Sequence, residues 1–314
     1  MLKRWTVISL FALLMLVLLP ATVARADNGP HGGYTATTDA CAGCHRAHTG
    51  GAARLLVSPV PGLCYTCHGS TATGADTNVE DGVYVDRDGN TETFPEGFPN
   101  RGLKAGGFVY ALMDTDWDSA AVSAPTTSHH TVDGTPATMW GNGAIGSGAG
   151  QLNVSLTCTS CHDPHGRAGT GGTPTYRLLR AIPTDSGAPT GVDVTDEPAK
   201  TYTVSSAFDA YFGESYGPLS SQLSNWCAQC HTRHAAPSGS GHTNSGDPIF
   251  TYRHTTTGFA IGCMNCHVAH GTSATMSGFA QNVAWPDGTL PAGNERSSLL
   301  RVDNRGVCEL CHLK

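Results

Sequence analysis

Hydrophobic positions form one long run near the start of the chain and only short groups after it. The run extends from Trp5 to Leu19. Beyond it there is no sustained 3.6-residue period, the pattern that predicts a long amphipathic helix. Residues 141–150 consist of Gly, Asn, Ala, Ile and Ser, a composition typical of a loop. The pattern predicts single helical turns and a few short strands joined by coil.

The first 26 residues have the three parts of a secretory signal peptide. A basic start precedes the apolar run, and Ala24-Arg25-Ala26 fits a cleavage site. An uncleaved membrane anchor is the alternative, but about 15 apolar residues fall short of the roughly 20 that span a bilayer. We therefore expect residues 1–26 to be removed and residues 27–314 to be exported, with no transmembrane segment.

Composition argues against a conventional packed core. The 314 residues include 39 Gly and 18 Pro, 14% are charged and 7% are aromatic; about 25% charged residues is usual. So few aromatic side chains indicate that a bound cofactor fills much of the interior. The formal net charge is −7, and it becomes −10 when Lys3, Arg4 and Arg25 leave with the signal peptide. This acidic balance excludes the basic surface of a nucleic-acid-binding protein.

All 12 cysteines belong to six C-x-x-C-H motifs. Two thiols three positions apart can bond to the two vinyl groups of a haem, and the adjacent imidazole can then bind the iron as proximal ligand. We therefore expect six covalently bound c-type haems. The cysteines are Cys41, Cys44, Cys64, Cys67, Cys158, Cys161, Cys227, Cys230, Cys263, Cys266, Cys308 and Cys311. The proximal histidines are His45, His68, His162, His231, His267 and His312.

Two other uses of the cysteines explain the motif less well. An exported chain with this many cysteines could form six disulfides, but disulfides give no reason for a histidine after every second cysteine. Zinc sites also use C-x-x-C pairs, but six such units would make an unusual zinc array in an exported protein. Haem attachment alone accounts for both the cysteines and the histidine of each motif.

Further histidines can supply the second axial ligand of each iron. Neutral imidazole is a good iron ligand, and six haems need at most six more, so every iron can be bis-histidine. Methionine is the alternative, but the mature chain has only Met113, Met139, Met264 and Met276. A saturated iron passes electrons without binding a substrate, so we assign no catalytic residue. The remaining histidines are His31, His48, His129, His130, His165, His234, His242, His254 and His270.

The motifs are arranged in pairs, which divides the mature chain into three di-haem modules of about 31–70, 150–235 and 250–314. Gly/Ser/Thr-rich loops connect the modules. After the first motif of each module comes a pair of leucines. The pairs are Leu55-Leu56, Leu178-Leu179 and Leu299-Leu300.

The first motif of each module extends to C-x-x-C-H-x-x-H, which adds His48, His165 and His270. Histidines three apart on a helical turn lie on neighbouring faces, so the second cannot bind the opposite side of the same iron. If each reaches back one module, His165 binds the first haem and His270 the third. His48 then has no earlier module in its own chain. We expect it to ligate the His267 haem of the adjacent subunit in a head-to-tail homopolymer.

The other distal ligands must come from loops. His130 and His254 are favoured because each precedes a motif-bearing module, and His242 comes next. His129 competes with His130 or joins it, since neighbouring residues of an extended strand point to opposite faces. His31 and His234 stay open as further alternatives.

The order of the motifs resembles that of extracellular multihaem c-type cytochromes that polymerise into conductive filaments (nanowires), in particular the OmcS-type hexahaem cytochromes. The resemblance is most specific at residues 156–166 and 224–231, and in a last motif that ends two residues before the C-terminus. It implies a multihaem cytochrome c fold, mostly coil with short helices and few strands wrapped around a continuous haem stack. It also implies a histidine donated across the subunit interface, at the position of His48. The chain is shorter than that pattern between the fourth and fifth motifs and between the fifth and sixth.

Together these observations predict an electron-transfer protein, secreted to the extracellular space or cell surface, that conducts through six bis-histidine haems in a polymer. One alternative is a monomeric exported electron shuttle, which would be periplasmic. Another is a multihaem oxyanion reductase, which needs an open iron position with acid or base groups nearby. The unaltered motifs and the surplus histidines disfavour the reductase, whereas only His48 separates the polymer from the shuttle.

Overall fold

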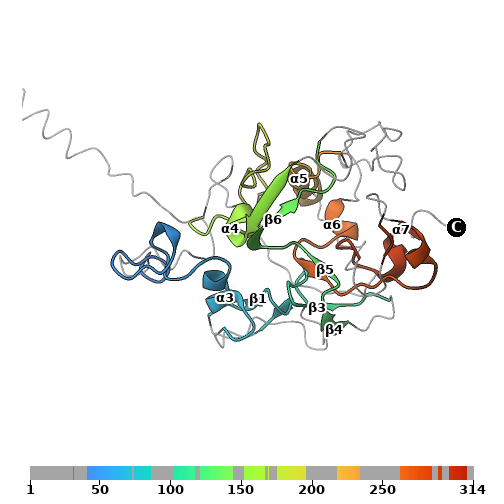
Figure 1. Cartoon of the computed structure of the whole chain (residues 1–314), viewed down its shortest axis with the longest axis horizontal. Helices are drawn as coiled ribbons and strands as arrows, with labels where there is room; N and C mark the ends of the chain where they lie inside the picture. The colour runs from blue at the N-terminus through green and yellow to red at the C-terminus, as the bar shows by residue number, and fades with distance from the viewer. Residues whose placement is uncertain are drawn as a thin grey trace, which may run out of the picture.

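A computed structural model shows short elements joined by long stretches of coil (Figure 1). It describes residues 31, 41–72, 74–85, 102–116, 121–143, 152–166, 169, 175–195, 218–233, 262–284, 289–291 and 297–309. The α-helices are α3 (Gly62–His68), α4 (Cys158–Cys161), α5 (Pro218–Cys227), α6 (Cys263–Cys266) and α7 (Gly306–Glu309). The 3₁₀ turns are η2 (Ala53–Leu55), η4 (Tyr176–Leu178), η6 (Gly278–Asn282) and η8 (Asp303–Arg305). The prediction of mostly coil with short helices and few strands is confirmed.

The strands form four antiparallel pairs within the described part of the chain. β1 (Thr77–Asn78) pairs with β2 (Val83–Tyr84), and β3 (Tyr110–Met113) with β4 (Val122–Pro125). β6 (Asp133–Thr138) pairs with β7 (Asn153–Thr157). β5 (Ser128–His129) instead pairs with the distant β8 (Gly271–Thr272). This last pair ties the segment before the second module to the third module.

The motif helices α4 and α6 are single turns with matching caps. The backbone N–H of Thr157 donates to the hydroxyl of Ser160 (3.0 Å), and that of Gly262 donates to the Asn265 side chain (2.7 Å). Ser160 and Asn265 are the second residues between their cysteines. A helix of one turn is unstable alone, so these caps and the surrounding packing hold the two motifs in shape.

Helix α5 is longer than the single turn expected from the sequence. Leu219, Leu223 and Trp226 recur at spacings of four and three, which places them on one helical face. That face packs against Leu179. The pattern covers only two turns, too few for a sustained helical period to stand out in the sequence.

The hydrophobic core is divided into small clusters. One contains Met276, Leu300, Val302 and Val307; a second contains Leu179, Val194, Leu219 and Leu223; a third contains Ala111, Met113 and Val268. All three lie in or beside the second and third modules. Within residues 41–72 no hydrophobic side chain is fully buried. The first module therefore lacks the cover that the other two have.

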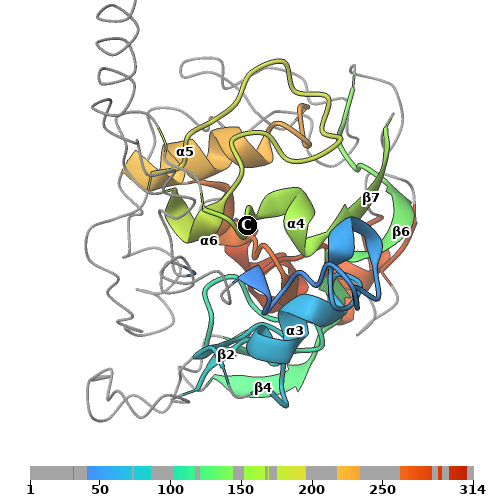
Figure 2. The same ribbon diagram turned by 90° about the vertical axis from the view of Figure 1, so that its left-hand side faces the viewer.

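The first and last modules lie at opposite ends of the longest axis of the described molecule. Figure 1 shows the segment just after residue 41 at one end and α7 at the other, with α4, α5 and α6 between them. Figure 2 looks at the first end, where α3 and the segment before it face the viewer. Among the helices that the structure describes, none has the length and apolar character needed to cross a membrane.

Candidate functional site

The first motif of every module is held against the turn that carries the paired leucines. In all three copies the residue after the proximal histidine donates its N–H to the carbonyl of the first leucine. The residue after the leucines donates to the carbonyl of the second cysteine, and all six distances are 2.7 to 2.9 Å. The copies are further marked by the β-bridges His45–Leu56, His162–Leu179 and His267–Leu300. The repeat in the sequence is therefore also a repeat of contacts.

Each of these turns contains two consecutive residues with positive φ. The pairs are Arg54-Leu55 (60° and 60°), Arg177-Leu178 (49° and 59°) and Ser298-Leu299 (53° and 60°). The second leucine of each copy donates its N–H to the residue three positions earlier, at 3.0 to 3.3 Å. This is the pattern of a type I′ turn, which usually requires glycine or asparagine. In this protein the hydrogen bonds between the turn and the motif hold residues with larger side chains in that conformation.

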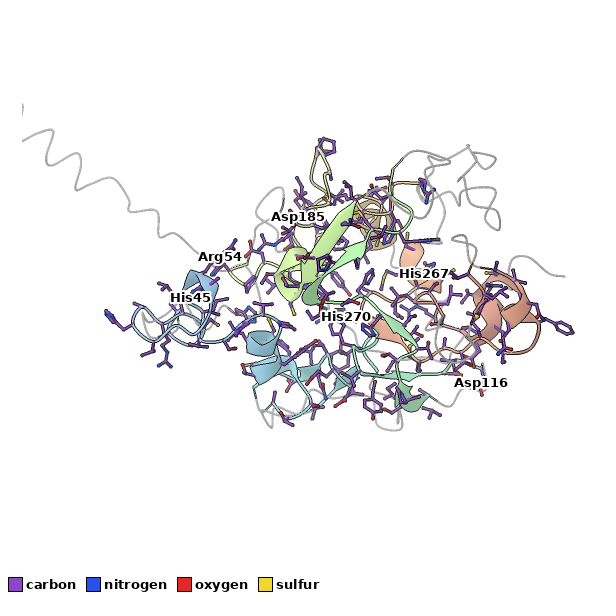
Figure 3. The ribbon with its side chains drawn as sticks, in the orientation of Figure 1. His45, Arg54, Asp116, Asp185, His267 and His270 are labelled. Atoms are coloured by element: carbon purple, nitrogen blue, oxygen red, sulfur yellow. The ribbon has the colours of Figure 1, made fainter. Side chains whose placement is uncertain are left out.

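The same turn orients the proximal imidazole. Nδ1 of His45 donates to the carbonyl of Arg54 at 3.0 Å, and the two residues lie side by side in Figure 3. Nδ1 of His162 donates to Arg177 at 2.7 Å, and Nδ1 of His267 donates to Ser298 at 3.2 Å. Because a carbonyl only accepts, Nδ1 carries the proton and Nε2 keeps the lone pair that can bind a metal.

The second motifs of the modules use other acceptors for the same purpose. Nδ1 of His231 donates to the carbonyl of Trp140 at 2.7 Å. Nδ1 of His68 lies 2.8 Å from the hydroxyl of Thr77 and 3.3 Å from its carbonyl. All five motif histidines that the structure describes thus have Nδ1 engaged by the protein.

Four pairs of imidazoles have their ring centroids at the spacing expected for two ligands of one iron. A bond from a metal to imidazole is about 2 Å long, so rings on opposite sides of one ion have centroids roughly 6 Å apart. In each pair one ring belongs to a motif and the other comes from a different segment. The pairs are His45 with His165 (5.9 Å), His68 with His31 (6.1 Å), His162 with His270 (6.4 Å) and His231 with His130 (6.4 Å). These residues fit a bis-histidine haem at each of four sites.

Two of the non-motif rings are anchored beside another non-motif histidine. Nδ1 of His31 donates to the carbonyl of Pro164 at 2.9 Å, immediately before His165. Nδ1 of His130 donates to the carbonyl of Ala269 at 2.7 Å, immediately before His270. The segment that carries His165 therefore also anchors His31, and the segment that carries His270 also anchors His130.

Burial keeps several of the paired imidazoles neutral, the form that binds a metal. It is the main reason that the pKa values of His162 and His130 are lowered. The pKa of His270 falls to about 3 because its ring is buried and because His162 and His130 lie close to it. Phe108 stacks on the His270 ring with centroids 4.6 Å apart, which excludes water from one face.

The cysteines show that successive motifs are spatial neighbours. The pKa of Cys44 is raised by burial and by Cys67, and that of Cys158 is raised chiefly by a hydrogen bond to Cys64. The pKa of Cys161 is raised to about 12 by burial, with Cys230 adding to it, and that of Cys227 is raised chiefly by Cys263. Cys266 and Cys308 pack against one hydrophobic cluster. The described parts of the six motifs therefore follow one another in space as they do in the sequence.

Two of the candidate histidines belong to no ring pair in the described part of the chain. His48 and His129 are both exposed. Cys311, His312, His234, His242, His254 and the expected signal peptide of residues 1–26 lie outside the described residues. His31, in contrast, does face a motif histidine, although its position alone did not single it out. The signal is that it lies upstream of the first motif of a module, as His130 does.

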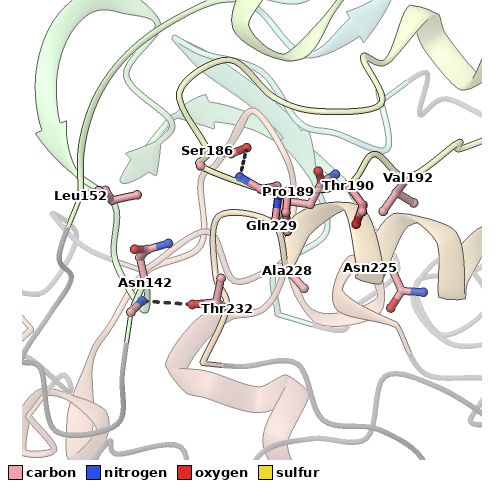
Figure 4. Close-up of a pocket in the computed structure, with 13 residues that line it drawn as sticks. Asn142, Leu152, Ser186, Pro189, Thr190, Val192, Asn225, Ala228, Gln229 and Thr232 are labelled. Carbon is pink, nitrogen blue, oxygen red and sulfur yellow. Dashed lines mark hydrogen bonds between the residues drawn. The ribbon is translucent and has the colours of Figure 1, made fainter.

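A cavity of about 430 Å³ lies beside the fourth motif (Figure 4). Its lining includes Asn142, Asn225, Gln229 and Thr232, and the Thr232 hydroxyl accepts from the N–H of Gly143 at 3.0 Å. The lining contains no cysteine and no histidine. We therefore assign no haem ligand to this cavity.

Comparison with known families gives one match. A family model described as the doubled CXXCH motif matches residues 34–73, which include the first two motifs. The match indicates a protein of the multihaem c-type cytochrome kind, with covalently bound haem. No curated protein and no solved structure matches the chain.

Proposed function

We propose that this protein is a secreted hexahaem cytochrome that conducts electrons through a series of bis-histidine sites. The observation that carries the proposal is the set of four facing imidazole pairs, each with a motif histidine whose Nε2 is left for a metal. Haem, when bound, supplies the one-electron chemistry. The chain's own residues attach it through the cysteines, fix its ligands and exclude water, and no acid or base side chain is needed.

The repeat extends the ligand set to the two remaining sites. His31 and His130 each lie upstream of the first motif of a module, and each ring is paired with the histidine of that module's second motif. His254 holds the matching place in the third module, nine residues before Cys263. We assign it to the sixth site, opposite His312. His165 and His270 each reach back one module, which leaves the fifth site to a histidine from another molecule.

That histidine is His48 of a neighbouring copy. It is exposed and belongs to no ring pair in the described part of the chain. The segment just after residue 41 lies at the opposite end of the molecule from α7 (Figure 1). Head-to-tail repetition of the contact between modules would continue the series across the interface. Such a heterologous interface does not close and so produces a filament.

Haem content and spin state test the first part of the proposal. Purified protein should contain six haems per chain by pyridine haemochrome assay and intact mass, and its ferric resonance spectrum should be entirely low-spin. A lower haem count contradicts the proposal. A high-spin signal accompanied by turnover of an oxyanion would support a reductase instead.

Electron microscopy tests the polymer. The native protein should form uniform filaments, and His48→Ala should give discrete particles that retain their haems. His129→Ala is the matched control, because it removes another exposed histidine, one outside the first module, and it should leave the filaments intact. Filaments that persist in His48→Ala would remove the bridging role. Discrete native particles would support the monomeric shuttle.

A further inference from the structure

An arginine contacts the C-x-x-C turn at the first motif of every module. Nε of Arg46 donates to the carbonyl of Ala42 at 2.7 Å, Nε of Arg180 to Thr159 at 2.6 Å, and Nε of Arg301 to Met264 at 2.8 Å. Ala42, Thr159 and Met264 all occupy the first position between the two cysteines. The three guanidinium groups therefore lie in the same place relative to the residues that would hold the haem.

The hydrogen bond from arginine to this carbonyl is present in all three modules, although the arginine occupies different positions of the repeat. Arg180 and Arg301 directly follow the paired leucines, where the first module has Val57. In the first module Arg46 follows the proximal histidine instead and reaches the equivalent carbonyl. The second motif of the first module is built differently, because the carbonyl of Tyr65 at this position accepts the helical N–H of Gly69 at 2.9 Å. The guanidinium contact to this carbonyl is thus present at the first, third and fifth motifs and is replaced by a helical hydrogen bond at the second.

The three guanidinium groups differ in how far they are buried. Arg301 is only 5% exposed, whereas the Arg180 side chain is 31% exposed and lies 3.8 Å from Asp163. Arg46 is exposed.

We propose that Arg46, Arg180 and Arg301 raise the reduction potentials of the first, third and fifth haems. This inference rests on the proposed function. A ferric haem carries one more positive charge than a ferrous haem, so a nearby guanidinium favours the reduced state. Solvent and counter-ions screen exposed charges more than buried ones. The effect should therefore decrease from Arg301 to Arg180 to Arg46.

The experiment is a spectroelectrochemical titration of the haem-containing protein with Arg180→Gln and Arg180→Lys. Arg180→Gln should shift one component, about one sixth of the haem absorbance, to lower potential by roughly a tenfold change in its reduction equilibrium. Arg180→Lys keeps the charge and should leave the potential close to that of the unmodified protein. Arg301→Gln should give a larger shift and serves as the second test if Arg180→Gln assembles poorly.

The outcomes separate this inference from the proposed function. Unchanged potentials in both glutamine variants with full haem content would overturn the role of the arginines and leave the conduit intact. Equal shifts in Arg180→Gln and Arg180→Lys would also overturn it, because the hydrogen bond rather than the charge would then set the potential. Native protein without haem would refute the proposed function itself.

Discussion

At the scale of single residues, the motif histidines use their two ring nitrogens for two different tasks. Nδ1 is held by the protein, through a backbone carbonyl at His45, His162 and His231 and chiefly through a hydroxyl at His68. Nε2 is left for the iron. Fixing the tautomer in advance removes the disorder that a freely rotating imidazole would bring to the site.

His31 gives the sharpest residue-scale prediction, because its ring lies 6.1 Å from that of His68. His31→Ala should convert one of six haems from low-spin to high-spin, since the second site loses its distal imidazole. Electron paramagnetic resonance of the ferric protein measures this. His129→Ala should remain entirely low-spin. A high-spin signal in His129→Ala without one in His31→Ala would contradict the pairing.

The spacing of the histidines in the sequence was most informative about the ligand pairs where the repeat is regular. The C-x-x-C-H-x-x-H extension predicted that His165 and His270 reach back one module, and their rings lie opposite His45 and His162. It did not single out His31, because that ring is anchored by the carbonyl of Pro164, a contact between residues 133 positions apart. Such a contact leaves no local pattern in the sequence.

At the scale of elements, the leucine pairs show both the strength and the limit of the sequence. Their recurrence identifies the repeat, but the left-handed conformation of Arg54-Leu55, Arg177-Leu178 and Ser298-Leu299 is not predictable from their residue types. Turn rules expect glycine or asparagine at such positions. Hydrogen bonds from the motif outweigh the local preference here, and they exist only once the tertiary structure has formed.

A close approach of two glycines supports the third site. Gly106 has φ +71° and forms a bridge to Gly271, and a Cβ on Gly106 would overlap the Gly271 carbonyl oxygen. We expect Gly106→Ala to lower the free energy of unfolding by about 3 kcal/mol and to displace the adjacent His270. Denaturant titration and the low-spin fraction measure the two effects.

Gly278→Ala is the matched control for that change. Gly278 also has positive φ, +56°, but nothing lies within 4 Å of an added Cβ. It should lower the free energy of unfolding by only about 1 kcal/mol, which is the backbone effect alone. Equal losses in the two variants would show that the contact with Gly271 does not matter.

At the scale of the whole molecule, corresponding residues of different modules differ in how much of their surface is buried by the rest of the chain. Leu178 is 7% exposed, whereas Leu55, its counterpart in the first module, is 53% exposed. In the second and third modules the rest of the chain supplies the cover. Within the described residues nothing gives the first module this cover, and a neighbouring molecule in the proposed head-to-tail contact would supply it.

The charges at the two ends lead to a prediction about salt. Residues 41–72 include Arg46 and Arg54 and no acidic residue, whereas Asp116 lies toward the opposite end. Burial is the main reason that the pKa of Asp303 is raised, and the negative charge of Asp116 raises it further. The two carboxyl groups are therefore neighbours. The chain as a whole has a formal net charge of −7, so copies of it would repel one another at long range. The Debye length at physiological ionic strength is about 8 Å, so opposite charges that met at the proposed interface would outweigh that longer-range repulsion.

Raising salt from ~0.15 M to ~1 M should therefore shorten the filaments, because it screens the attraction between the ends. Sedimentation followed by haem absorbance measures the loss. Arg54→Gln should assemble more weakly at low salt and respond less to added salt, while part of the assembly should survive throughout because the bond from His48 to iron is not screened. Filaments that lengthen in high salt would mean that net repulsion dominates, and the ends would then not meet as proposed.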